Sequence, residues 1–290
     1  MGILHADLEI TLQNPDYLAL LNVTDSHGRS PLHWAALRGD ERAIEILLRA
    51  GADACIQGRE KRTPLHYAIE SGNVRCVELL LMAGCNVHNR DIVGHAALQV
   101  AAWAADMPAM LEVIFLAGAS LNAKSHYGAT ALHSAADLNH YRNVEYLLAM
   151  GAELECSDND GDTPLYDSIR YGNSETLEVL LRHGARFDYT NKSGQTALHI
   201  AALFGTLRGL ELLMTSGLEG LSTESRDEKG KTAMEAFYDR VAPPDGFKEA
   251  LEALLKHVDS LQGAYDDNDH EDENSDIFVD ALEHLDVTKV

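Results

Sequence analysis

A short motif recurs along this 290-residue chain at a nearly constant interval, and this repeat constrains the fold more than any other feature. The motif is Ser, Thr or Ala, then Pro or Ala, then Leu or Met. Its copies begin at Ser30, Thr63, Ala96, Thr130, Thr163, Thr196 and Thr232. They are 33, 33, 34, 33, 33 and 36 residues apart. A fixed period of this kind is typical of repeat proteins, whose units bury their apolar faces by stacking on one another.

Each unit is predicted to contain two helices. Ser or Thr suits a helix N-cap, and Pro or Ala suits the first helical turn that follows it. A second segment of each unit has apolar residues at i, i+3 and i+4, as in Ile44, Leu47 and Leu48. This is the spacing of one buried helical stripe. Glycines mark the expected helix ends: Gly39, Gly72, Gly172 and Gly205, then Gly51, Gly84, Gly118, Gly151, Gly184 and Gly217.

The frame of Thr-Pro-Leu-His followed by Leu-Leu-x-x-Gly-Ala resembles the ankyrin repeat over residues 25–258. The resemblance implies an all-α fold, an ankyrin-repeat α-solenoid of seven stacked helix-turn-helix units with β-hairpin-like loops. Residues 1–24 are then expected to be a partial N-terminal capping segment. The third unit departs from the frame, with Gln99 where His is expected. The seventh lacks the final glycine, as suits a C-terminal cap that faces water on one side.

Residues 259–290 are predicted to form an acidic, largely disordered tail. Ten of the last 26 side chains are acidic and one is basic, within a net charge of −23 for the whole chain. Ile277, Phe278 and Leu282 recur at helical spacing, which resembles a segment that folds on a partner. Three interpretations stay open: a solubilising tail, a partner-docking or activation-type motif, and a flap over the chain's own basic end.

Composition limits the classes of function. The negative charge argues against electrostatic binding to nucleic acid or to anionic membranes. The sequence has no run of about 18 apolar residues, so we expect no transmembrane helix. It also begins without a secretory signal pattern. The four cysteines, which lack paired spacing, are read as free cytosolic thiols: Cys55, Cys76, Cys85 and Cys156.

The residues indicate no catalytic or metal chemistry. One histidine occupies the same position in each of four units, which places them too far apart to share one ion: His33, His66, His133 and His199. The resemblance implies that they bond neighbouring backbone. Asp158–Asp162 looks like a calcium loop, but its twelfth position is Ile169 rather than Glu. Phosphate-binding loops and nucleophile motifs are also missing, so we expect a protein that is not an enzyme and has no cofactor and no metal.

The resemblance also implies where partners bind, namely at the loop residues before each motif and at the end of each first helix. Large aromatics and Arg, the residue types that anchor interfaces, are frequent at these positions. The expected partner-binding residues are Arg29, Arg38, Arg59, Arg62, Val93, Trp103, Tyr127, Leu138, Tyr171 and Phe204. The arginines of the first two units predict a basic end that meets an acidic partner segment. Solvated charged loops, and packing of Trp103 and Phe204 between helices, are the alternatives.

We therefore expect a monomer, cytoplasmic and/or nuclear, that binds one or more partner proteins or peptide segments as a scaffold or adaptor. Two other roles remain open. One is a transcriptional coregulator or inhibitor that uses the ankyrin groove and the acidic tail. The other is a non-catalytic targeting subunit of an enzyme complex. The residues do not separate these roles, because one fold supports many functions.

Overall fold

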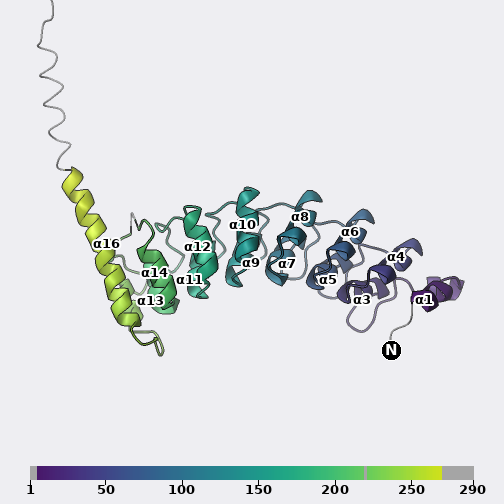
Figure 1. Cartoon of the computed structure of the whole chain (residues 1–290). Coiled ribbons are helices and arrows are strands. Elements are labelled where there is room, and N and C mark those ends of the chain that lie inside the picture. Colours follow the sequence, from purple (N-terminus) through teal and green to yellow (C-terminus); the bar gives the residue numbers. More distant parts are fainter. Residues whose placement is uncertain (1–4, 219–220, 270–290) are drawn as a thin grey trace, which may run out of the picture. The chain divides into compact units, whose positions relative to one another are not determined.

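The computed structural model describes residues 5–218 and 221–269, and in that part of the chain it contains helices and no strands (Figure 1). The chain divides into two compact units, Met1–Ala185 and Arg186–Val290. All seven predicted helix pairs are present. In the first unit they are α3 (Pro31–Leu37) with α4 (Glu41–Arg49), α5 (Pro64–Glu70) with α6 (Val74–Met82), α7 (Ala97–Ala104) with α8 (Pro108–Leu116), α9 (Ala131–Asp137) with α10 (Tyr141–Ala149), and α11 (Pro164–Arg170) with α12 (Ser174–Arg182). In the second they are α13 (Ala197–Phe204) with α14 (Leu207–Met214), and α15 (Ala233–Phe237) with α16 (Phe247–Asp269).

Within the first unit the helices form two rows. The first helices of successive repeats pack on one another, from α3 to α11, and the second helices form a parallel row from α4 to α12. The predicted apolar stripes lie between the rows, where side chains such as Leu80, Leu111 and Leu147 are fully buried. In the second unit α13 packs on α15 and α14 on α16. We number the repeats 1 to 7 by their first helices, so repeat 1 begins with α3 and repeat 7 with α15.

In the four repeats that have it, the histidine of the motif bonds the backbone before the next repeat, as the resemblance implied. His66 Nδ1 accepts a hydrogen bond from the Thr63 N–H at 3.1 Å, so Nε2 carries the proton and donates to the His95 carbonyl of repeat 3. The other histidines of this row reach the next repeat in the same way. Gln99 does the same work with an amide, accepting from the Ala96 N–H and donating to the Ala129 carbonyl. Burial lowers the pKa of His66 to about 4, so the ring is neutral at pH 7.

The loops before the motif stack by backbone hydrogen bonds. The Ile92 N–H donates to the Glu60 carbonyl at 2.8 Å, and the His126 N–H donates to the Val93 carbonyl at 3.0 Å. Gly94 allows this close approach, because a Cβ there would lie 2.5 Å from the His126 ring. Repeats 2 to 5 are therefore tied to one another along both the helices and the loops, which makes a stiff support for side chains on this face.

Two predicted glycine helix ends differ from the others. Second helices before Gly51, Gly84, Gly118, Gly151 and Gly184 end in the left-handed turn that was predicted. Gly217 does not have a positive φ. Gly205 has a φ of −57°, and glycine is needed there because a Cβ would lie 2.5 Å from the Ala201 carbonyl oxygen. In repeat 4 the left-handed residue after the first helix is Asn139, with a φ of 59°.

Helices extend into both flanking segments. The N-terminal segment contains α1 (His5–Thr11) and α2 (Pro15–Leu18), and α1 packs against α4, with an ion pair between Glu9 and Arg42. The last helix, α16, continues beyond residue 258, where the tail was expected to begin, to Asp269. The predicted amphipathic segment at residues 277–285 lies outside the described residues. Among those that are described, no helix is long and apolar enough to span a bilayer.

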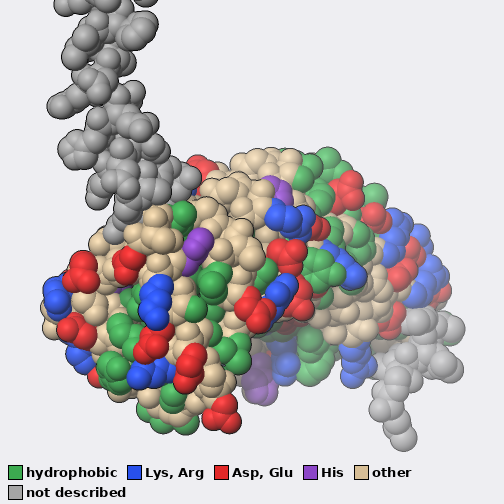
Figure 2. All heavy atoms as spheres, turned by 60° about the vertical axis from the view of Figure 1, so that its left-hand side comes forward, with side chains coloured by type: hydrophobic (Ala, Val, Ile, Leu, Met, Phe, Trp, Pro, Cys, Tyr) green, Lys and Arg blue, Asp and Glu red, His purple; other side chains and the backbone are tan. Residues whose placement is uncertain are grey.

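The surface carries charges of both signs. Figure 2 shows acidic and basic side chains interspersed with apolar ones over the visible face, rather than separated by sign. Several are pairs within one helix, such as Arg75 with Glu78 at 2.9 Å. Exposed pairs of this kind contribute little to stability, about 0.3–0.5 kcal/mol each. The net charge of the chain is therefore a poor guide to the charge of any one site.

Candidate partner-binding groove

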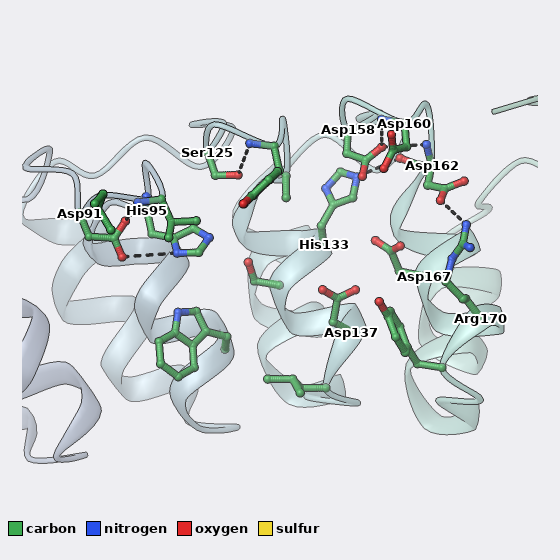
Figure 3. A pocket seen from close by; sticks show the side chains of 18 of the residues that line it. Asp91, His95, Ser125, His133, Asp137, Asp158, Asp160, Asp162, Asp167 and Arg170 are labelled. Atoms are coloured by element: carbon green, nitrogen blue, oxygen red, sulfur yellow. Dashed lines mark hydrogen bonds and ion pairs between the residues drawn. The ribbon is translucent and has the colours of Figure 1, made fainter. Parts of the chain in front are cut away.

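A groove of about 790 Å³ crosses repeats 2 to 5 on the side formed by the loops and the first helices (Figure 3). Loops contribute one wall, and the ends of α5, α7, α9 and α11 contribute the other. Six of the ten predicted partner-binding residues line it: Arg62, Val93, Trp103, Tyr127, Leu138 and Tyr171. All six belong to the first unit, so the groove is complete within one compact body.

Apolar side chains in this groove are exposed to solvent. Tyr127 is 67% exposed, Ile92 and Tyr171 are each 59% exposed, and Leu138 is 50% exposed. Trp103 is half-buried on a first helix, and its indole Nε1–H is buried without a hydrogen-bond partner among the described residues. The two interpretations of Trp103 therefore combine, because it packs against the helix row and also lines the groove.

The groove is acidic, which differs from the expectation of a basic binding end. Its lining includes eight carboxylates and two guanidinium groups. Arg62 forms an ion pair with Glu70 and lies over the Tyr67 ring at 4.7 Å. Arg170 forms an ion pair with Asp162. Both cations are thus balanced locally, and the acidic surplus of the lining remains.

The other predicted arginines lie outside the groove. Arg29 Nε is 3.3 Å from Asp25 Oδ2, and its guanidinium lies 3.9 Å from the centre of the Trp34 ring. Arg38 and Arg59 are exposed. The basic end therefore has one arginine that is paired with an acid, Arg29, and two exposed ones, of which Arg38 lies 6.0 Å from the centre of the same Trp34 ring. Phe204, 43% exposed at the end of α13, belongs to the second unit.

Two carboxylates that we did not predict lie on the floor of the groove. Asp137 is the last residue of α9, and Asp167 lies in the middle of α11 with only 8% of its surface exposed. Figure 3 shows both carboxyl groups pointing into the same space below the loop residues Asp158, Asp160 and Asp162. Burial, then the charge of Asp158, raises the pKa of Asp137 to about 6. Burial, then the charge of Asp137, raises the pKa of Asp167 well above its usual value.

The aspartate-rich loop of repeat 5 has a local structural role. Asp158 Oδ1 accepts hydrogen bonds from the Asp160 N–H at 2.8 Å and the Asp162 N–H at 2.9 Å. Asp91 in repeat 3 makes the equivalent pair of bonds. These are side-chain-to-backbone turns, which Asp and Asn favour. Across the described residues, His, Cys, Asp and Glu side chains do not gather in any group of three that could hold a metal ion.

The cysteines are free thiols. Cys76, Cys85 and Cys156 are buried, and burial raises the pKa of Cys76 and of Cys156 to about 11. Such thiols stay protonated at neutral pH, so they are poor nucleophiles. Cysteine chemistry therefore contributes nothing to the groove, and partner binding is left to aromatic, aliphatic and charged side chains.

Two comparisons with known proteins agree with this architecture. A family model described as ankyrin repeats (3 copies) matches residues 8–91, 98–191, 151–227 and 170–264. Among solved structures, the chain is similar to the crystal structure of the human ASB11 ankyrin repeat domain, with 28% sequence identity and a TM-score of 0.67. That match covers 78% of this chain and 98% of the other.

Proposed function

The chain belongs to the ankyrin-repeat family, and on that premise we propose that it binds an extended segment of a partner protein in the groove over repeats 2 to 5. Ankyrin repeats are generally protein–protein interaction modules and are typically non-catalytic. In this proposal the chain is a scaffold or adaptor whose work is to present a stiff surface.

The observation that carries the proposal is the convergence of exposed apolar side chains in one groove. Single exposed apolar residues are ordinary on protein surfaces, but a group of them in a concave site with polar groups around it is typical of binding sites. Tyr127, Leu138 and Tyr171 form such a group and are each at least half exposed. Hydrogen bonds between repeats hold the backbone beneath them, so binding orders little of the chain and loses little entropy.

Selection of displayed random peptides on the purified full chain tests this proposal. A selected peptide should lose affinity by about tenfold or more for Tyr127→Ala/Tyr171→Ala, because two anchoring side chains are removed. The matched control is Met82→Ala/Leu116→Ala, which removes two side chains that are each 76% exposed on second helices outside the groove. Fluorescence anisotropy measures both. Equal losses in the two variants, or no loss in either, would contradict a groove-based function.

A further inference from the structure

We propose that the partner segment carries an arginine whose guanidinium group binds between Asp137 and Asp167, in the place of a cation that repeat 4 lacks. The inference rests on the proposed function, since it names the chemistry of the segment that the groove would hold.

The first support comes from the register of the repeats. We count positions from the N-cap residue, so that −1 is the residue before it and +7 is a residue in the last turn of the first helix or, in repeat 7, just after it. In three repeats these two positions carry opposite charges and form an ion pair. The pairs are Arg62 with Glu70 in repeat 2, Asp162 with Arg170 in repeat 5, and Lys231 with Asp239 in repeat 7. The fold therefore brings positions −1 and +7 within ion-pairing distance.

Repeat 4 breaks this pattern. Its +7 residue is Asp137, but its −1 residue is Ala129, which has no charge to offer. Both residues line the groove. Among the described residues, no hydrogen bond or ion pair engages the Asp137 carboxylate. The groove thus contains an acid whose cation position, filled by Arg62 in repeat 2, is occupied only by a methyl group.

Asp167 is a second and independent anomaly. It occupies position +4, where the other repeats have aromatic, aliphatic or small side chains: Trp34, Tyr67, Val100, Ser134, Ile200 and Ala236. Asp167 is more than nine-tenths buried and lines the groove, and in the described part of the chain no hydrogen bond or ion pair engages its carboxylate, although the charge of Arg170 acts on it against the larger effect of burial. Burying such a group without a partner is costly. Its nearest cation on the same helix, Arg170, is already paired with Asp162.

The geometry favours a side-chain cation over a metal ion. Asp137 and Asp167 come from neighbouring helices and face one space, yet they do not form part of a group of three ligands close enough for a metal. A guanidinium group has five N–H donors in a planar fork, which can reach two carboxylates at once. It is also more weakly hydrated than an ammonium group, which suits a site where Asp167 is buried.

The chain itself shows how arginine is held on this face. Arg29 lies over the Trp34 ring at 3.9 Å beside Asp25, and Arg62 lies over the Tyr67 ring at 4.7 Å beside Glu70. Each arginine has both an acid and an aromatic ring as neighbours. The groove offers the same combination at repeats 3 to 5, where Trp103 and Tyr171 line it together with Asp137 and Asp167.

The inference reverses the electrostatic expectation from the sequence. An acidic segment would meet eight acidic side chains in the groove, and like charges across an interface disfavour binding. A basic segment meets complementary charge and a vacant cation position. The arginines that predicted an acidic partner lie largely outside this groove or are already paired.

The test uses the full chain and four displayed nonapeptide libraries whose central residue is fixed as Arg, Lys, Gln or Glu. The best peptides are then labelled and measured by fluorescence anisotropy. We expect the Arg library to give the tightest peptides, and replacement of that Arg by Gln to weaken binding about tenfold. Replacement by Lys should weaken binding less, since the charge remains but the fork is lost.

Two protein variants locate the arginine. Asp137→Asn/Asp167→Asn removes both carboxyl groups at nearly constant volume and should weaken the Arg peptide about tenfold. Ala129→Arg supplies the missing cation from within the chain and should weaken it similarly by occupying the site. The matched control, Glu112→Gln/Glu178→Gln, removes two exposed charges of the same unit outside the groove and should leave affinity within about twofold. Thermal denaturation of every variant confirms that it is folded.

The outcomes separate the inference from the function on which it rests. An Arg preference that both groove variants abolish supports the inference. Peptides that bind the wild-type groove without an Arg preference, or that bind Asp137→Asn/Asp167→Asn equally well, overturn the inference and leave the proposed function standing. Equal loss in the control variant also overturns it, because the effect would then be general electrostatics. Failure of all four libraries to bind the wild-type chain overturns both.

Discussion

Repeat 2 and repeat 4 share one scaffold but treat charge in opposite ways. Both present a capped first helix whose histidine bonds the next repeat, and both bury the same apolar stripe. Repeat 2 then balances its charges internally, with Arg62 between Glu70 and Tyr67. Repeat 4 leaves Asp137 without a cation, beside the buried Asp167 of repeat 5. The difference shows that the buried core residues are the same in kind from repeat to repeat. The side chains at positions −1, +4 and +7 vary, and these are the positions that line the groove.

The largest expected effect comes from truncating a buried core side chain in each of the two repeats. Leu80→Ala in repeat 2 and Leu147→Ala in repeat 4 each empty a fully buried site. We expect each to lower the free energy of unfolding by about 3 kcal/mol, measured by urea denaturation. If one site costs much less than the other, the two repeats do not share an equivalent scaffold.

The contribution of the histidine links to stability can be distinguished from that of the groove acids, because the two depend on pH in opposite ways. His66 has a pKa near 4 in the folded chain against an ordinary 6.5, so the unfolded chain binds more protons between these values. Stability is therefore fully present above about pH 6.5 and falls as the pH drops towards 4. His66→Gln should keep both hydrogen bonds, as Gln99 does, and remove this loss, worth about 3 kcal/mol near pH 4. Urea denaturation at pH 7.5, 5.5 and 4 measures it, and an unchanged pH slope in the variant would refute the link.

The unpaired acids predict a change of stability with pH that is opposite in sign to that of His66. The pKa of Asp167 is raised in the folded chain, so its contribution to stability becomes less favourable as the pH rises above the ordinary carboxyl value. Asp167→Asn should therefore stabilise the chain at pH 7.5, on the order of 1 kcal/mol, with a smaller gain at pH 4. The matched change in repeat 2, Glu70→Gln, breaks an existing ion pair and should destabilise slightly. Destabilisation by Asp167→Asn at pH 7.5 would show that this carboxylate is already satisfied.

The smallest expected effect comes from placing a cation at Ala129, the −1 position of repeat 4. Ala129→Arg gives repeat 4 the ion pair that repeat 2 already has and should raise stability by about 0.5 kcal/mol. Arg62→Ala should lower it by a similar amount plus the loss of packing on Tyr67. The difference in melting temperature between these variants and the wild type is the measurement. A decrease with Ala129→Arg would mean that the −1 and +7 positions of repeat 4 do not meet as they do in repeat 2.

Much of the fold could be predicted because its signals are local and repeated. The caps at Ser30 and Thr63 and the stripe from Ile44 recur in the same register, and one histidine per repeat has one role. The groove residues Trp103, Tyr127 and Tyr171 could be predicted because the resemblance implied which positions of each unit contact partners, and the constant repeat period locates those positions. Asp137 and Asp167 could not, because an acidic residue in a short helix looks like an ordinary solvated charge. Their burial arises only when α9 and α11 pack together, and the pairing of −1 with +7 depends on how the loop folds back over the helix.

Gln99 has a consequence for how the first unit would come apart. Repeats 1 to 5 of that unit are joined by four side-chain links of this row, three through a histidine and one through Gln99. An amide does not titrate, so acid that protonates the imidazoles weakens three junctions and spares the fourth. Acid near pH 4 should therefore loosen the unit unevenly, with the junction between repeats 3 and 4 retained longest. The middle of the groove, around Trp103 and Asp137, is the portion that would outlast its ends.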